Sequence, residues 1–427
     1  MKESSFSRAR TIVRQLSRTV LLATFIVATA ADAFTATYHV IHRFTGGIDG
    51  GGAYAGVVFD AAGNLYGTAV SGGSGDGVVF RLSPIKGGGW KETVLYTFTG
   101  GNDGSQPHGG VILDGAGNVY GTTTFGGDPG CSCGVVFMLT PAKSAPWKET
   151  VMHAFTPRND GANPGIGSGL IFDVAGNLYG TTDEGGDFFG GTFFRLSPSG
   201  NGSWNETVLY SFGNGGTLPN GPLVFDAAGN LYGTSAGGGA FDMGTVFKLS
   251  PVGPDNWTET VLYEFGGQSW NPNGGVIFDP AGNLYGTAML GPFPDFCGGN
   301  GCGVVFQLSP NGNGNWNYTN IYTYHGHRDG AFPAAGLTFD AAGNLYGTTT
   351  MSGHDDDIVY TPFRFGTVFE LSPANGGWQE TILHWFGTPR SGARPQSKLV
   401  RDATGTVYGT TPEGGGLGQG VVFKIVP

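Results

Sequence analysis

Aromatic and acidic side chains gather in a set of glycine-rich loops along this chain. The candidates for ligand contact are Phe188, Phe189, Trp270, Phe293, Phe296, Asp295, Asp355, Asp357 and Tyr360. Flat rings can stack on sugar rings, and neighbouring polar groups can fix the orientation of a bound ligand. These residue types therefore suit a glycan or a cell-surface polymer. In the alternative interpretation, the rings pack the loops onto the body of the protein and the acids are solvated.

Carboxylates in the same loops could also be catalytic. Glycosidases use two carboxyl groups about 5–9 Å apart, and Asp183, Asp187 and Asp356 are the candidates for such a pair. The sequence does not give their separations. No Gly-x-Ser-x-Gly motif stands between a strand and a helix, and the glycines precede strands, so neither a serine nucleophile nor a phosphate loop is indicated.

Histidines are candidate metal ligands at two places. His325 and His327 alternate, which in extended backbone puts both rings on one side, and His354 precedes three Asp residues. Asp49, Asp103, Asp160 and Asp329 each precede Gly, an arrangement that suits either weak cation binding or a simple turn. We expect no cofactor, with Ca²⁺ or another divalent metal as the alternative.

A repeat determines how these loops are positioned. The motif Asp-x-Ala-Gly-Asn-Leu-Tyr-Gly-Thr, with two variants, begins at Asp60, Asp114, Asp173, Asp226, Asp279, Asp340 and Asp402. Each unit contains four runs rich in β-branched and aromatic residues, and in the first unit they are Gly56–Phe59, Leu65–Thr68, Gly77–Leu82 and Thr93–Phe98. Because the runs are apolar throughout, each sheet needs cover on both faces. Seven such units predict an all-β, seven-bladed propeller of four-stranded antiparallel blades.

The strand count predicts how the ring closes. Six fourth strands begin near a Trp, but the chain ends at Gly420–Pro427, directly after the seventh third strand. Residues 36–44 have the pattern of a fourth strand, so we expect them to pair into the last blade and remove two open sheet edges. The predicted blades are approximately 56–98, 110–155, 169–212, 222–265, 275–324, 336–386 and 398–427 plus 36–44, within a propeller domain of residues 34–427.

The N-terminal 33 residues resemble a secretory signal peptide. Basic residues precede the apolar run Val20–Ala28, and Ala31–Ala33 offers small residues for cleavage. A retained anchor is the alternative. We expect a secreted protein, extracellular or periplasmic, that is a monomer without a transmembrane segment in its mature chain. The net charge of −11 argues against nucleic-acid binding, which depends on Lys and Arg.

Cysteine placement fits an oxidising compartment. Cys131 and Cys133 share one loop, and Cys297 and Cys302 share another, three blades away. Bridges between the two loops would form only if both loops reached over the axis of the ring. We expect a Cys297–Cys302 disulfide, and either a Cys131–Cys133 disulfide or a free, redox-active pair.

Gly-Asn-Leu-Tyr-Gly-Thr followed by Gly-Thr-Val-Phe-x-Leu resembles the GloVer, or "choice-of-anchor", tandem repeats of bacterial exported proteins. Examples are Gly229–Thr234 with Gly244–Leu249, and Gly343–Thr348 with Gly366–Leu371. The resemblance covers nearly the whole mature chain and implies export, in many cases with a surface-sorting segment. This chain departs from that pattern because it ends on a blade strand, so we expect no C-terminal anchor.

Loop length indicates which face is functional. The loops between second and third strands and the links between blades are long and variable, and in an up-and-down blade they emerge on one face. We therefore expect a non-enzymatic binding or scaffold module whose ligand is a glycan or cell-surface polymer. The alternatives are an extracellular polysaccharide hydrolase or lyase and a purely structural envelope protein.

Overall fold

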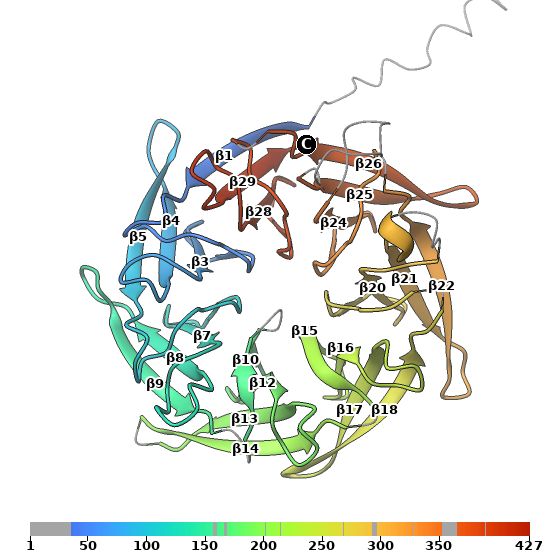
Figure 1. The fold of residues 1–427 in the computed structure, drawn as a ribbon, viewed down its shortest axis with the longest axis horizontal. Coiled ribbons are helices and arrows are strands. Elements are labelled where there is room, and N and C mark those ends of the chain that lie inside the picture. The colour runs from blue at the N-terminus through green and yellow to red at the C-terminus, as the bar shows by residue number, and fades with distance from the viewer. Residues whose placement is uncertain are drawn as a thin grey trace, which may run out of the picture. The chain divides into compact units, whose positions relative to one another are not determined.

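The computed structural model describes residues 36–427 except 157–159, 166–168, 201, 214, 268, 293–296, 327, 352–364 and 389. The chain divides into two units, Met1–Ala36 and Thr37–Pro427. The second unit consists of seven antiparallel sheets arranged in a ring (Figure 1). This confirms the predicted seven-bladed propeller.

The blades follow one another along the chain. Blade 1 contains β2 (Val58–Phe59), β3 (Leu65–Ala69), β4 (Val78–Pro84) and β5 (Trp90–Thr97). Blade 2 contains β6 (Ile112–Leu113), β7 (Val119–Thr123), β8 (Val135–Thr140) and β9 (Lys148–Ala154). Blade 3 contains β10 (Ala162–Pro164), β11 (Ile171–Phe172), β12 (Leu178–Glu184), β13 (Thr192–Pro198) and β14 (Trp204–Ser211). Blade 4 contains β15 (Thr217–Phe225), β16 (Leu231–Gly237), β17 (Thr245–Gly253) and β18 (Asn256–Glu264).

The remaining blades complete the ring. Blade 5 contains β19 (Val276–Phe278), β20 (Leu284–Ala288), the short 3-10 helix η1 (Cys297–Gly299), β21 (Val304–Pro310) and β22 (Trp316–Thr323). Blade 6 contains β23 (Thr338–Phe339), β24 (Leu345–Thr349), β25 (Thr367–Ala374) and β26 (Gly377–Trp385). Blade 7 contains β27 (Val400–Arg401), β28 (Val407–Thr411), β29 (Val421–Val426) and β1 (Thr37–Arg43). In the part of the chain that the structure describes, no helix has the length and apolar character of a membrane span.

Strand β1 closes the ring as the sequence predicts. It pairs antiparallel with β29, from Thr37 opposite Val426 to Arg43 opposite Val421. The N-terminal and C-terminal ends of the described chain therefore share one sheet (Figure 1). In blade 1 the fourth strand begins at Trp90, three residues before the apolar run that starts at Thr93. It does so because Trp90 still pairs with Pro84 across the turn.

The repeated Asp motif fixes the turn between the first two strands of each blade. Asp60 Oδ1 accepts hydrogen bonds from the backbone N–H groups of Ala62 and Asn64, while Asp60 Oδ2 accepts from the Asn64 amide and the Tyr66 hydroxyl. Partial burial opposes ionisation, but these hydrogen bonds outweigh it and lower the pKa of Asp60. The motif is therefore structural: its polar groups satisfy one another.

The Gly in each Tyr-Gly-Thr allows close packing inside the blade. A Cβ on Gly347 would lie 2.5 Å from the ring of Phe369, and the same clash occurs at the other six repeats at 2.6–2.7 Å. All seven phenylalanines are fully buried. Neighbouring blades then meet through aromatic rings, since the Trp that opens one outer strand packs on the motif Tyr of the preceding blade, as Trp90 does on Tyr408 at 6.2 Å between ring centroids.

Candidate functional site

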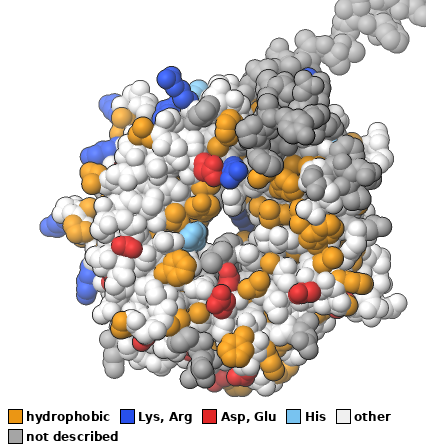
Figure 2. All heavy atoms as spheres, in the orientation of Figure 1, with side chains coloured by type: hydrophobic (Ala, Val, Ile, Leu, Met, Phe, Trp, Pro, Cys, Tyr) orange, Lys and Arg blue, Asp and Glu red, His pale blue; other side chains and the backbone are white. Residues whose placement is uncertain are grey.

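The long loops lie on one face of the ring, which we call the loop face. It is formed by the loops after each second strand and by the links that enter each blade. Isolated β-bridges join the two sets within a blade, for example Gly51 with Ser71 and Ala393 with Glu413. In Figure 2, most Lys and Arg side chains lie at the periphery of the disc, whereas hydrophobic side chains are spread between the periphery and a central opening.

Each blade link presents one side chain from a left-handed backbone position. The seven equivalent residues have φ between 54° and 68°, and they are Gly52, Gln106, Asn163, Leu218, Asn271, Phe332 and Arg394. The N–H of each donates to a carbonyl just before the third strand of the preceding blade, as Leu218 does to Gly190 at 2.9 Å. The backbone is thus the same in every blade while the side chain differs.

The sequence analysis missed this set of seven, which we call the link ring. A signal was present, because six of the seven residues precede a proline, from Pro107 to Pro395. The proline also sets the spacing between blades. A Cβ on Gly77 would lie 2.5 Å from Pro107 Cδ, and five further Gly–Pro pairs repeat this contact at 2.4–2.8 Å.

In the part of the chain that the structure describes, the most exposed aromatic side chains of the loop face lie over blades 3 and 4. Phe188 is 69% exposed, Phe189 is 70% exposed and Phe241 is 64% exposed. Phe188 and Phe241 occupy equivalent loop positions and lie over the link backbone of their blades, since a Cβ on Gly213 would be 3.2 Å from the Phe188 ring and one on Gly266 2.6 Å from the Phe241 ring. Asp187, which directly precedes Phe188 and Phe189, is also exposed.

The other predicted ligand contacts differ in position. Trp270 is half-buried, pairs through its backbone with Leu290 and packs against the core between blades 4 and 5, so it supports its loop. The remaining candidates lie outside the described residues: Phe293, Asp295, Phe296, Asp355, Asp357 and Tyr360.

The predicted catalytic carboxylates have unlike environments. Asp183 is only 8% exposed, and its Oδ1 has no hydrogen-bond partner. Burial, aided by the charge of Glu184, raises the pKa of Asp183 to about 8. Asp187 is exposed in the loop that follows, and Asp356 lies outside the described residues.

Of the predicted histidine ligands, the structure describes His325. Its ring Nδ1 lies 3.2 Å from Asp329 Oδ2, and its backbone N–H donates to the same oxygen at 2.9 Å. Asp329 therefore caps the turn, as Asp49, Asp103 and Asp160 do for the Thr four residues before each of them. His327 and His354 lie outside the described residues.

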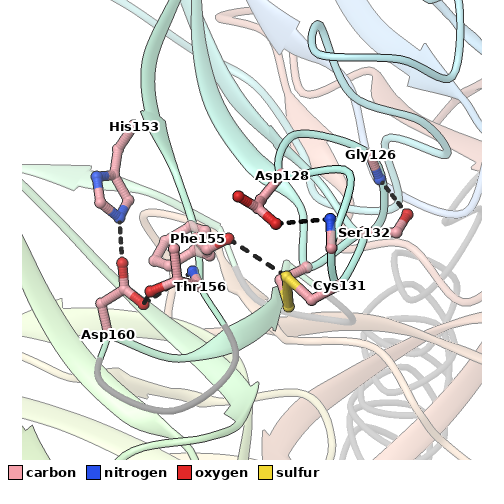
Figure 3. The surroundings of a disulfide bond; sticks show 10 residues. Gly126, Asp128, Cys131, Ser132, His153, Phe155, Thr156 and Asp160 are labelled. Carbon is pink, nitrogen blue, oxygen red and sulfur yellow. Dashed lines mark hydrogen bonds and ion pairs between the residues drawn. A yellow bond between two sulfur atoms is a disulfide. The ribbon is translucent and has the colours of Figure 1, made fainter.

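Both cysteine pairs are disulfides, Cys131–Cys133 and Cys297–Cys302. Each clips a loop of the loop face to itself. Cys131 Sγ also lies 3.6 Å from the carbonyl oxygen of Phe155, so this loop rests on the end of β9 (Figure 3).

A second cluster of polar side chains lies between the blades, on their outer strands. Five glutamates recur two residues after the opening Trp: Glu92, Glu149, Glu206, Glu259 and Glu380. Each faces a His or Tyr of the preceding blade or closing strand, and the Oε1 atom of each is buried without a hydrogen-bond partner. Burial raises the pKa of the first four to about 7 and that of Glu380 to about 8.

The sequence analysis did not predict these interfaces between outer strands. The recurring Glu of Trp-x-Glu-Thr was visible in the sequence, but the alternation of residues along its strand suggests that it is solvent-exposed. Its burial is caused by the neighbouring blade, which no local pattern reveals.

Comparison with known proteins places the repeat in a family. The model of a family described as the Gloeobacter/Verrucomicrobia repeat matches residues 27–224, 75–286 and 219–427. A solved structure of a protein of unknown function from Dyadobacter fermentans is similar over 92% of this chain and 99% of its own, with 12% identity and a TM-score of 0.45. No curated protein matches the chain in sequence.

Proposed function

The chain belongs to the Gloeobacter/Verrucomicrobia repeat family, and from the arrangement of its loop face we propose that it is an exported, non-catalytic binding protein for a glycan or cell-surface polymer. The observation that carries this proposal is the concentration of exposed rings, Phe188, Phe189 and Phe241, on the face where side chains vary. Exposed rings of this size beside polar groups are typical of ligand surfaces.

The backbone conformation of the link ring also supports the proposal. Left-handed non-glycine residues are uncommon and are tolerated where the surrounding structure fixes them. Here a fixed hydrogen bond holds the position, and its occupants range from Gly through Asn and Gln to Leu, Phe and Arg. A scaffold that holds the backbone constant while side chains vary is suited to recognition rather than to one conserved reaction.

Glycan chemistry fits the face better than an anionic polymer does. Phe188 and Phe189 follow Asp187, and Phe241 precedes Asp242, so each loop places a carboxylate next to its exposed rings. A ring can cover the apolar face of a sugar while a carboxylate accepts from its hydroxyls. The net charge of −11 disfavours phosphate-rich ligands.

Two further observations support export. The disulfides Cys131–Cys133 and Cys297–Cys302 persist in oxidising compartments. The N-terminal basic and apolar pattern suits a secretory signal peptide.

One observation favours a second function, a polysaccharide hydrolase. A buried carboxyl with a pKa of about 8, as at Asp183, stays protonated at neutral pH and could serve as a general acid. The exposed Asp187 would then be the second carboxyl group of the pair.

A glycan array followed by turnover assays on the bound glycans separates the functions. The binding proposal expects retention of specific glycans without product. Product formation that is lost in Asp183→Asn, Asp187→Asn or Asp356→Asn would instead establish the hydrolase. Failure to bind any glycan, together with self-assembly in light scattering, would favour a structural envelope protein.

A further inference from the structure

We call the contact between the outer strands of two neighbouring blades a seam. The same two strand positions face each other at these seams, but the residues that occupy them differ. A residue near the end of one outer strand faces a residue near the start of the next. Where both carry rings, they stack, as His384 does on Tyr38 at 3.7 Å and Tyr263 on Tyr318 at 4.1 Å between ring centroids. Where a Tyr meets a Glu, the phenol donates to it, as Tyr210 does to Glu259 at 3.1 Å.

Two seams combine a His with two carboxylates, in the part of the chain that the structure describes. Between the closing strand β1 and blade 1, these residues are His42, Asp49 and Glu92. Between blades 2 and 3, they are His153, Asp160 and Glu206. In each group the three candidate ligand atoms lie within 4.8 Å of one another.

We propose that His42, Asp49 and Glu92 bind a divalent transition metal ion of the zinc class, and that His153, Asp160 and Glu206 form the equivalent second site. An imidazole with two carboxylates gives three protein ligands and leaves one position for water. The nitrogen ligand favours Zn²⁺ over Ca²⁺ or Mg²⁺, which take oxygen ligands.

The geometry of the first group suits a metal better than it suits hydrogen bonds. His42 Nε2 lies 3.8 Å from Asp49 Oδ2 and 4.0 Å from Glu92 Oε1. Both separations are too long for a hydrogen bond, whereas ligands bound to zinc at 2.0–2.2 Å stand about 3.3–3.6 Å apart in a tetrahedron. A shift of a few tenths of an ångström would bring His42 Nε2 to this separation from each carboxylate oxygen, and the two carboxylate oxygens lie within 4.8 Å of one another.

Two of the three ligand atoms of the first group also lack other partners. His42 Nε2 and Glu92 Oε1 are both buried with no hydrogen bond. Leaving such buried groups unpaired is unfavourable, and a bound metal ion would give both of them a partner.

A threonine four residues before each Asp holds that carboxylate in place. Asp49 Oδ2 accepts from the backbone N–H of Thr45 at 2.9 Å, and its Oδ1 accepts from the Thr45 hydroxyl. Asp160 is held in the same way by Thr156 (Figure 3). Such outer contacts orient metal ligands. In the second group His153 Nε2 and Asp160 Oδ2 form a hydrogen-bonded pair at 2.8 Å, which a bound metal would replace, and Glu206 Oε1 is unpartnered.

The metal would join the closing strand to blade 1. His42 lies on β1, Asp49 in the link that follows it, and Glu92 on β5. The first site would therefore strengthen ring closure in addition to any role in ligand binding.

The test is zinc titration of metal-free full-length protein, with bound metal counted by elemental analysis after buffer exchange. His42→Tyr and His153→Tyr introduce the residue that stands at the equivalent position in Tyr96, so both should fold. We expect two zinc equivalents in wild type, one in each single variant and none of the two in the double variant. Cobalt should give the absorption bands of tetrahedral coordination, which each variant reduces by about half.

The control is Glu259→Gln, which changes a buried Glu at a seam whose partner is Tyr210. It should bind zinc as wild type does. The proposal is overturned if the double variant retains as much zinc as wild type, or if wild type binds none at a concentration of 100 µM, a generous ceiling for a structural site.

Discussion

The hydroxyl of Tyr322 donates a hydrogen bond to Glu380 Oε2 at 3.0 Å across the seam between blades 5 and 6. Burial raises the pKa of Glu380 to about 8, Tyr322 lowers it in part, and Asp329 raises it. The glutamate is therefore held in its protonated form when the ring is folded and ionises readily when it is not.

The free energy of unfolding should therefore decrease as the pH rises, because Glu380 ionises. Because its folded-state pKa lies above the unfolded value, its stabilising contribution is complete below about pH 4.5 and is lost as the pH rises to about 8. Glu380→Gln keeps an acceptor for Tyr322 and removes the titration. We expect the variant to be more stable than wild type by about 1–3 kcal/mol at pH 8.5, and to match it at pH 4.5.

Chemical denaturation across this pH range measures the effect. Glu264→Gln is the control, since Glu264 is an exposed glutamate at the end of the outer strand of blade 4. Parallel pH profiles for wild type and Glu380→Gln would show that Glu380 does not titrate as described.

The Gly of the repeat motif should be intolerant of even one added carbon. Gly347→Ala would place Cβ 2.5 Å from the Phe369 ring, and overpacking of this kind costs about 1–3 kcal/mol. Gly115→Ala, where nothing lies within 4 Å, should change the free energy of unfolding by less than about 0.5 kcal/mol. Phe369→Leu should relieve part of the penalty in the double variant. Equal melting temperatures for the two alanine variants would contradict the packing argument.

Ring closure should depend on the first strand. Deleting residues 34–44 removes β1, leaves β29 with an open edge and takes away the stacking of Tyr38 on His384. We expect the cooperative transition in calorimetry to disappear, while a chain that starts at residue 36 keeps it. An unchanged transition in the deletion variant would mean that the ring does not need this strand.

The fold was predictable because its signals repeat. Seven copies of the Asp turn and the Tyr-Gly-Thr strand indicate equal blades, and the missing fourth strand points to residues 36–44. The candidate site was less accessible. Phe188 and Phe189 were identified as exposed loop rings, but Asp183 of the same loop region is buried, and the seams at Glu92 and Glu380 arise from contacts about 45–60 residues apart. Burial of this kind depends on the assembled ring.

Asp183 provides a second test of burial at the loop face. Its folded pKa of about 8 exceeds its unfolded value, so its contribution to stability is lost as the pH rises from about 4 to 8. Asp183→Asn should therefore raise the melting temperature at pH 8.5 by several degrees and leave it nearly unchanged at pH 4. Asp187→Asn, at an exposed carboxylate of the following loop, is the control for the substitution itself. A destabilised Asp183→Asn at pH 8.5 would instead indicate that the ionised carboxylate is needed.

The most direct test of the proposed function is the affinity of an array-selected glycan for a variant with Phe188→Ser, Phe189→Ser and Phe241→Ser. The matched control is Val174→Ser with Val252→Ser, because these exposed side chains lie in the turn between β11 and β12 and near the end of β17, at the ends of the strands away from the loop face. Isothermal titration should show affinity at least tenfold weaker for the phenylalanine variant, or about 1.4 kcal/mol, and unchanged affinity for the control. Equal binding by both variants, or loss in the valine variant alone, would contradict a binding site on the loop face.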